Sequence, residues 1–250
     1  RDRSQATVSR ALRGATNVTE ETRIKVQRAA DQLNFTLSKS ASALASGKTM
    51  RVILLVSGKL NEWFNSGVLQ GVYEELAPVG YDVTPAFITD RSELDRFFSQ
   101  LPKSRNADAI IISSFQLMPA MRDQLQAIDL PTVGVNVPAE SGYFDASISI
   151  DNSSAMTMAV RLLRSLGHTN IAFCSDYIPA DMVYNTSQRT QAFADAAQAN
   201  ATDGITFSLL TADAHDAPLS KSDLASQLTA KLLSLPERPT AVCVETDQVA

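Results

Sequence analysis

A chain of 250 residues allows one large domain, or a small domain followed by a large one. A hydrophobic content of 44% is sufficient for a core and excludes a disordered chain, while the net charge of −5 argues against a protein coated with nucleic acid along its whole length. No apolar run approaches the roughly 18 residues that span a bilayer, and residues 1–30 contain no apolar signal-peptide region. We therefore expect a cytoplasmic protein with no membrane partner.

The charge is distributed unevenly along the chain. Residues 1–48 contain nine Arg or Lys and four Asp or Glu residues, a net charge of +5, which leaves −10 for the remainder. A basic head on an acidic body is typical of a DNA-binding segment fused to a small-molecule domain, although a basic surface helix without a function has the same balance.

Two helices are predicted at the N-terminus. The first is capped by Ser4 and ends near Gly14, with an apolar face. The second runs from Thr19, as its cap, to Leu33, and carries acids in its first turn where the helix dipole favours them. The two helices need each other, and a third, to bury their apolar faces. Those faces hold Val8, Ala11 and Leu12 in the first helix and Thr22, Val26, Ala29, Ala30 and Leu33 in the second.

Residues 38–46 are nearly all small, with Leu44 as the one large apolar residue. Two copies of such a segment could pack closely in a DNA minor groove. A flexible linker with one buried Leu fits the same residues.

From Met50 onward, short apolar runs alternate with helical patterns. Strands are expected at 51–56, 81–87, 109–112, 132–135, 146–150, 171–174, 206–210 and 241–244, and helices at 64–77, 92–100, 119–128, 153–166, 186–198 and 221–235. This alternation predicts an α/β fold of parallel sheets flanked by helices, arranged as two sheets with the crossing near residues 135–150. Cys174 and Cys243 both fall in expected strands, which favours two free thiols in the core over a disulfide.

Ligands of open α/β sheets bind beyond the carboxyl ends of the strands. That rule selects polar and aromatic residues that follow the expected strands. Trp63 and Phe64 could instead be core or dimer-interface aromatics, Asp151 is equally well placed to cap the next helix, and His168 is expected to be structural. The candidates from this rule are Trp63, Phe64, Ser113, Asn136, Asp151 and Asp247.

Several runs together resemble the LacI (lactose-repressor) family of bacterial transcription regulators. They are Thr7-Val8-Ser9-Arg10, the run from Val18 to Arg23 with Val26, Leu33-Asn34-Phe35, Ala43-Leu44-Ala45, and Leu166-Gly167-His168 ahead of the expected strand at Ile171. The resemblance implies a small all-α helix-turn-helix segment and a hinge helix ahead of a two-lobed core like that of periplasmic binding proteins. The corresponding ranges are 1–36, 37–48 and 49–250, with lobes at about 49–148 and 149–250. We expect the family's first helix to be missing before Arg1 and the second lobe to be incomplete.

The resemblance also implies roles in reading DNA. The first helix of this chain corresponds to the helix that lies in the major groove, where Gln5 can pair with adenine and Ala6 can contact a thymine methyl. Leu44 corresponds to the residue that wedges between base steps, and Leu37 stands where the family often has Pro. The expected DNA-binding residues are Ser4, Gln5, Ala6, Thr7, Ser9, Arg10, Ser38 and Leu44.

For the effector, the run that begins at Arg189 resembles the family's Arg-x-x-Gly-Phe, and Asp247 matches its ligand-binding Asp. Arg offers several donors and Asp accepts from hydroxyls, a pair suited to a sugar or a sugar derivative, with a purine as the less favoured choice. The resemblance further implies a homodimer on double-stranded palindromic operator DNA, with no cofactor and no metal.

The leading interpretation is therefore an effector-controlled transcription regulator, of which a repressor is the default. A solute-binding protein of a transport system would share the core, but it predicts a signal peptide and no helix-turn-helix. An enzyme is disfavoured because the sequence has no Gly-x-Ser-x-Gly elbow, no P-loop and no metal-spaced His or Cys set.

Overall fold

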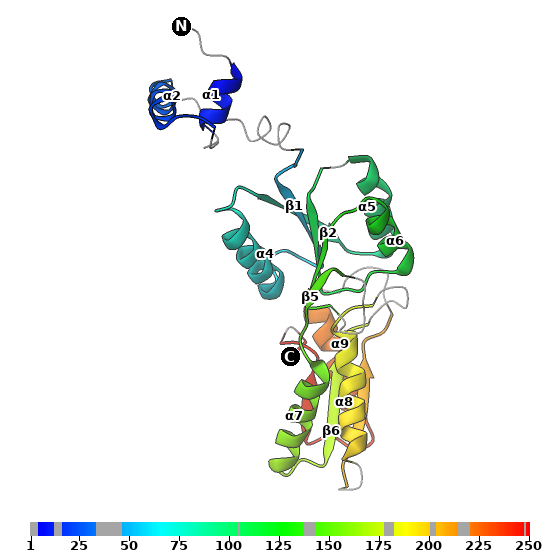
Figure 1. Cartoon of the computed structure of the whole chain (residues 1–250). Coiled ribbons are helices and arrows are strands. Elements are labelled where there is room, and N and C mark those ends of the chain that lie inside the picture. Colours follow the sequence, from blue (N-terminus) through cyan, green and yellow to red (C-terminus); the bar gives the residue numbers. More distant parts are fainter. Residues whose placement is uncertain are drawn as a thin grey trace. The chain divides into compact units, whose positions relative to one another are not determined.

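The computed structural model describes residues 5–12, 17–33, 47–104, 106–137, 144–177, 183–200, 204–214, 221–247 and 249–250 (Figure 1). The chain divides into two compact units. One comprises residues 1–51 together with 106–108, and the other comprises residues 52–105 and 109–250.

The first unit contains α1 (Gln5–Leu12) and α2 (Glu20–Gln32), which pack against each other. Ala11 of α1 and Val26 and Ala30 of α2 are buried, as the apolar spacing predicts. Ala29 and Leu33 depart from the prediction, since both are exposed, Leu33 by 78%. The cap differs too: Thr19 stands at the N-cap of α2, but its hydroxyl donates to Thr22 Oγ1 at 2.9 Å instead of accepting from a backbone N–H.

The segment that leads into the first strand is held by the carboxylate of Asp108. Its Oδ1 accepts hydrogen bonds from the backbone N–H and the hydroxyl of Thr49, at 2.7 and 3.0 Å, and its Oδ2 accepts from the N–H of Met50 at 2.9 Å. Met50 has a φ of 53°, an uncommon value for a residue with a side chain. Although burial, the largest single effect, raises the pKa of Asp108, these hydrogen bonds outweigh it and hold that pKa below its usual value.

The second unit begins with a five-stranded sheet in the order β2-β1-β3-β4-β5. Parallel pairing joins β1 to β3, β3 to β4, and β4 to β5. The interior strand β1 is buried from Val52 to Val56, as expected for a strand covered on both faces. In Figure 1, α4 lies on one side of this sheet and α5 and α6 on the other. The strands are β1 (Arg51–Ser57), β2 (Asp82–Ile88), β3 (Ala109–Ser113), β4 (Thr132–Val135) and β5 (Ala146–Ile148), and the helices are α4 (Trp63–Leu76), α5 (Arg91–Ser104) and α6 (Pro119–Ala127).

A second parallel sheet follows, with the order β7-β6-β8. On one face Phe173 of β6 stacks on Phe193 of α8, and Val160 of α7 joins the same core cluster. On the other face Cys174 packs with Leu224 of α9. The strands are β6 (Asn170–Ser175), β7 (Thr206–Thr211) and β8 (Ala241–Val244), and the helices are α7 (Asn152–Ser165), α8 (Ser187–Ala199) and α9 (Lys221–Leu233).

The α/β prediction of two parallel sheets with helices on their faces is confirmed. Both cysteines are free. Phe173 pairs with Cys243 and Cys174 pairs with Val244, so the two thiols point to opposite faces of one sheet and cannot join. The ends of some helices and strands differ from the predicted ends. Helix α5 runs to Ser104 through Pro102, which lies in its last turn, and β5 stops at Ile148. In the described part of the chain, no helix is both long enough and apolar enough to span a membrane.

We predict that Asp108→Asn lowers the free energy of unfolding at pH 7 by about 1–3 kcal/mol, the range for hydrogen bonds to a charged group. Because the pKa of Asp108 is depressed in the folded protein, its contribution is complete above the ordinary pKa and is lost as the pH falls through the folded value. The deficit of the variant should therefore shrink in acid. Urea unfolding at pH 7 and pH 3 measures it, with the exposed Asp123→Asn on α6 as the matched control. A deficit that is the same at both pH values would contradict the assignment.

Candidate functional site

The residues expected to read DNA lie on α1 or outside the described part of the chain. Thr7 is half-buried and Arg10 is exposed in the last turn of α1. Val8 and Leu12 are half-buried on the face toward α2, as the apolar spacing predicts. Gln5, Ala6 and Ser9 are on α1, but their side chains are not described. Ser4, Ser38 and Leu44 lie outside the described residues.

In the second unit, polar side chains gather where β3 and β4 end. Ser113 is the last residue of β3 and is fully buried, with its hydroxyl 3.4 Å from that of Ser114. Asn136 follows β4, and its Nδ2 donates to Ser114 Oγ at 3.4 Å. Ser114 and Asn136 have φ angles of 73° and 53°, so both strands turn sharply at this edge. These two side chains thus meet at the carboxyl ends of neighbouring strands.

Asn185, just before α8, connects that edge to the second half of the unit. It is 0% exposed. Its backbone N–H donates to Ser114 O at 3.0 Å, and its Nδ2 donates to Asn136 Oδ1. Its own Oδ1 accepts from Asn152 Nδ2, at the start of α7, at 3.0 Å. Through its backbone and its side chain, this one buried residue therefore joins the ends of β3 and β4 to the beginnings of α7 and α8. The bridge between Phe115 and Tyr184 lies beside it.

Arg189 continues the network toward β8. Its Nε donates to Asn152 Oδ1 at 3.1 Å, and its Nη1 donates to the backbone oxygen of Glu245 at 2.6 Å. The guanidinium is half-buried and so is held in place from two elements. The fixed fork leaves further N–H groups that can face a ligand.

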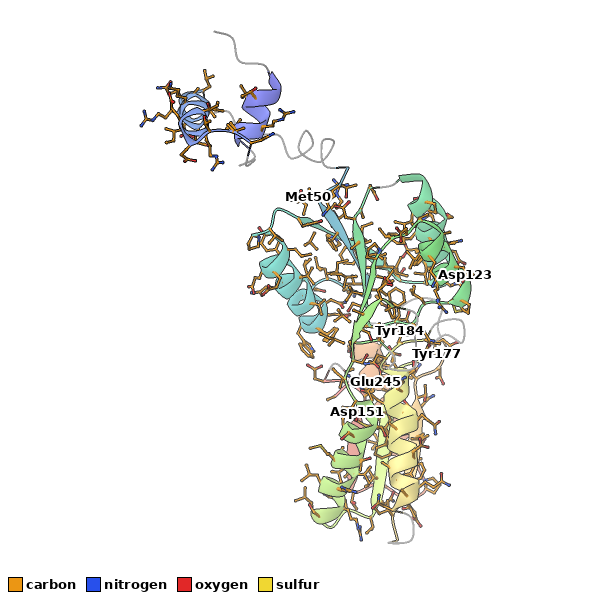
Figure 2. All side chains as sticks on the ribbon, viewed as in Figure 1. Met50, Asp123, Asp151, Tyr177, Tyr184 and Glu245 are labelled. Carbon is orange, nitrogen blue, oxygen red and sulfur yellow. The ribbon has the colours of Figure 1, made fainter. Side chains whose placement is uncertain are left out.

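Glu245 directly follows β8 and is only 8% exposed. Its backbone N–H donates to Cys174 O at 2.9 Å, which extends the pairing of β8 with β6. Burial, followed by the repulsion of the Asp176 carboxylate, raises the pKa of Glu245 to about 7, against a backbone hydrogen bond from Asp176 and the attraction of Arg189. Figure 2 labels Glu245 together with Asp151 and Tyr184, close to the first turns of α7 and α8.

Trp63, the single Trp, is the first residue of α4 and is 65% exposed. Its Nε1 donates to Asp247 Oδ1 at 3.3 Å, and its ring lies edge-on to that of Phe64 with 5.6 Å between the centroids. Asp247 is exposed and Phe64 is half-buried. The bond to Asp247 brings the end of β8 to the start of α4, although the two residues are 184 positions apart.

Asp151 and His168 have local partners. Asp151 is the N-cap of α7, and its Oδ1 accepts from Ser154 N at 2.9 Å, as the capping interpretation expects. The Nδ1 of His168 lies 3.1 Å from Thr240 Oγ1, in keeping with a structural role. His215 lies outside the described residues. Among the described residues, no group of three or more His, Cys, Asp or Glu side chains is arranged to hold a metal ion.

Reasoning from the sequence singled out neither Asn185 nor Glu245. Glu245 could have been found, because it follows a strand and the rule for ligand positions covers it. Asn185 precedes a helix after a long loop, where no local pattern marks a buried amide. Asn152, its partner, was visible only as a neighbour of Asp151.

Two family models match the chain. The model for bacterial regulatory proteins of the lacI family matches residues 4–38, and the model for a periplasmic binding protein-like domain matches residues 160–250. The first match covers α1 and α2. The second covers the last six residues of α7, from Val160 to Ser165, and the chain from β6 onward, including Arg189, Glu245 and Asp247.

Individual relatives agree with these models. The chain is 28% identical over 193 residues to the HTH-type transcriptional regulator AglR of Rhizobium meliloti (strain 1021), covering 74% of this chain and 52% of that protein's length. It is 28% identical over 250 residues to the HTH-type transcriptional repressor PurR of Vibrio cholerae serotype O1 (strain M66-2), covering 99% of this chain and 70% of the repressor.

Among solved structures, a lac repressor dimer bound to operator and the anti-inducer ONPF has the same fold. It superposes with a TM-score of 0.78 at 21% identity and covers 99% of this chain and 71% of that chain.

We predict that Asn185→Ala lowers the free energy of unfolding by about 1–3 kcal/mol, because the buried Oδ1 of Asn136 loses its donor and the Nδ2 of Asn152 loses its side-chain acceptor. Urea unfolding of the whole chain measures the loss. The exposed Asn61→Ala, which makes the same truncation on the loop before α4, should stay within about 0.5 kcal/mol of the parent. Equal effects of the two substitutions would show that the amide network contributes nothing.

Proposed function

Because this chain belongs to the lacI family of bacterial regulatory proteins, we propose that it is a transcription repressor whose affinity for operator DNA is controlled by a small effector. The observation that carries this proposal is the joint presence of the lacI-family match over α1 and α2 and of a polar site at the carboxyl ends of the strands in the second unit. The protein is proposed to act as a cytoplasmic homodimer. It is a binding protein in this proposal and performs no chemistry on its ligand.

On the DNA side, α1 is the helix assigned to the major groove. Its exposed Arg10 supplies a charge-assisted contact to a phosphate or to guanine, and Gln5 and Ala6 stand at the end of the helix that meets base edges. The segment 38–46 is assigned to the minor groove, with Leu44 as the wedge. Operator affinity then depends on how two copies of this segment are spaced in the dimer.

The effector is proposed to bind at the strand ends of the second unit. Trp63 offers an aromatic face for the C–H surface of a sugar ring, Arg189 offers donors, and Asp247 accepts from hydroxyls. A sugar or a sugar derivative suits this combination better than a purine. The polar contacts through Asn185 are those that would change when a ligand enters. Ligand and operator binding are coupled, and the coupling is reciprocal: each changes the affinity for the other by the same factor.

A solute-binding protein would share the periplasmic binding protein-like match over residues 160–250. The lacI-family match over residues 4–38 belongs to the regulator and not to that alternative. DNA binding by the intact chain is the property that separates the two.

Arg10→Gln should weaken binding to duplexes enriched from a random-sequence pool by about tenfold at 0.15 M salt. The slope of log affinity against log salt should also become shallower by about one. The variant neutralises one fewer phosphate and therefore releases fewer counterions on binding. Fluorescence anisotropy of labelled duplexes measures both quantities. Arg161→Gln, the same change at an exposed position of α7, should leave affinity and slope unchanged. A salt slope near zero for the parent would refute the regulator.

Titration of the intact protein with sugars, sugar phosphates and purines should produce a saturable change in Trp63 fluorescence with a sugar-class ligand. Arg189→Lys keeps the charge but loses the fork of donors, so the affinity for that ligand should fall by about tenfold or more. Arg161→Lys is the matched control, with no expected change. If a purine were the only ligand that gives a saturable change, the preferred effector class would be purines and not sugars.

A further inference from the structure

We propose that the effector carries a protonated amine and that Glu245 is the carboxylate that receives it. The inference rests on the proposed function, because it assigns a ligand group to the same site. It goes beyond the Arg189 and Asp247 pair by naming a charge on the ligand that hydroxyl recognition does not require.

The first ground is an incomplete set of hydrogen bonds at a buried carboxylate. Glu245 is 8% exposed, and its Oε2 is buried with no hydrogen-bond partner among the described residues. Arg189, the nearby cation, donates to Asn152 Oδ1 and to the backbone oxygen of Glu245. A buried acceptor of this kind loses its hydration without compensation unless a donor reaches it, and none of the described residues supplies that donor.

The second ground is the sign of the charges at the same edge. Asp176 follows β6, Glu245 and Asp247 follow β8, and Asp151 caps α7, whereas Arg189 is the cation bonded into this network. The site is therefore rich in negative charge. A neutral hydroxyl would satisfy one lone pair but leave this excess, while an ammonium group satisfies the lone pair and reduces the excess.

The third ground is the aromatic beside these carboxylates. The indole of Trp63 is bonded to Asp247 and is mostly exposed, so its face is open to a ligand. Cations are attracted to aromatic faces and most strongly to Trp. Carboxylates next to one exposed indole favour a small cationic ligand. The hydroxyls of such a ligand could bond to Arg189 and Asp247.

The state of Glu245 fits this assignment. With its pKa raised to about 7 by burial and by Asp176, the carboxyl is protonated in a large part of the molecules at neutral pH. An ammonium ligand favours the ionised form, so binding expels the proton and strengthens as the pH rises from 6 to 8. The groups that share this environment are Asp176, which raises the pKa, and Arg189, which lowers it.

The test uses ligand pairs that differ only by an amino group in place of a hydroxyl: 1-amino-1-deoxyglucitol against glucitol, glucosamine against glucose, and galactosamine against galactose. Binding is followed through Trp63 fluorescence in phosphate buffer. We expect the amine of at least one pair to bind about tenfold more tightly than its neutral partner, at pH 8 for the aliphatic amine and near pH 7 for the less basic amino sugars, where their amines are still protonated. Between pH 6 and 8 the affinity for the aliphatic amine should rise by up to about tenfold, because Glu245 gives up its proton over this range.

Glu245→Gln keeps the shape and removes the charge, so it should abolish both the amine preference and the pH dependence. The variant is expected to fold, since a group whose folded pKa is raised destabilises the protein above its ordinary pKa and the neutral amide does not. Urea unfolding at pH 8 verifies this. Glu237→Gln, at an exposed position before β8, is the control that should keep both properties.

Equal binding of the two members of each pair, no binding of any amine, or an amine preference that survives in Glu245→Gln would each overturn the inference. The duplex-binding assay on the same preparation distinguishes this failure from failure of the proposed function. A chain that binds DNA with a normal salt slope and responds only to neutral sugars is a regulator without an amine effector. A chain that does not bind DNA is not a regulator.

Discussion

The amide of Asn185 is the interaction on which the arrangement of the candidate site depends. It is fully buried and accepts from Asn152 while donating to Asn136. A buried amide stays in such a place only if its donors and acceptor are paired, because each unpaired group loses its hydration without compensation. Together with the backbone N–H of the same residue, which donates to Ser114 O, this amide holds the loops that end β3 and β4 to those that begin α7 and α8.

The chemistry of that junction differs from the chemistry of the layers on either side. Phe173 and Phe193 stack within the second sheet's core, and Leu54 to Val56 are wholly buried in β1. Apolar cores of this kind are costly to open. Hydrogen bonds between neutral amides contribute only about 1 kcal/mol each, and water or a ligand can replace them. A polar junction between two apolar cores is thus the place where a ligand can act at low cost.

The junction also holds charged side chains that affect one another. Arg189 spans from Asn152 to the backbone of Glu245, so two nitrogens of its guanidinium are already bonded to the protein. Burial of the Glu245 carboxyl and, after it, the repulsion of Asp176 raise the pKa of Glu245 to about 7. At the other end of the chain, the basic N-terminal residues and exposed Arg10 provide the opposite sign, suited to phosphate.

Local sequence by itself determined the fold class and the two helices α1 and α2, because alternating apolar runs and helical spacing are short-range signals that report directly on burial. It also determined that Trp63, Asn136, Arg189 and Asp247 follow strands or begin helices, since ligand positions in parallel sheets obey a local rule. Only the tertiary structure decided that Trp63 bonds to Asp247, that Asn185 bridges three segments, and that Glu245 is buried without a full set of partners. The physical reason is that hydrogen-bond pairing and desolvation depend on which distant groups share a low-dielectric space. No spacing within one segment encodes that distance.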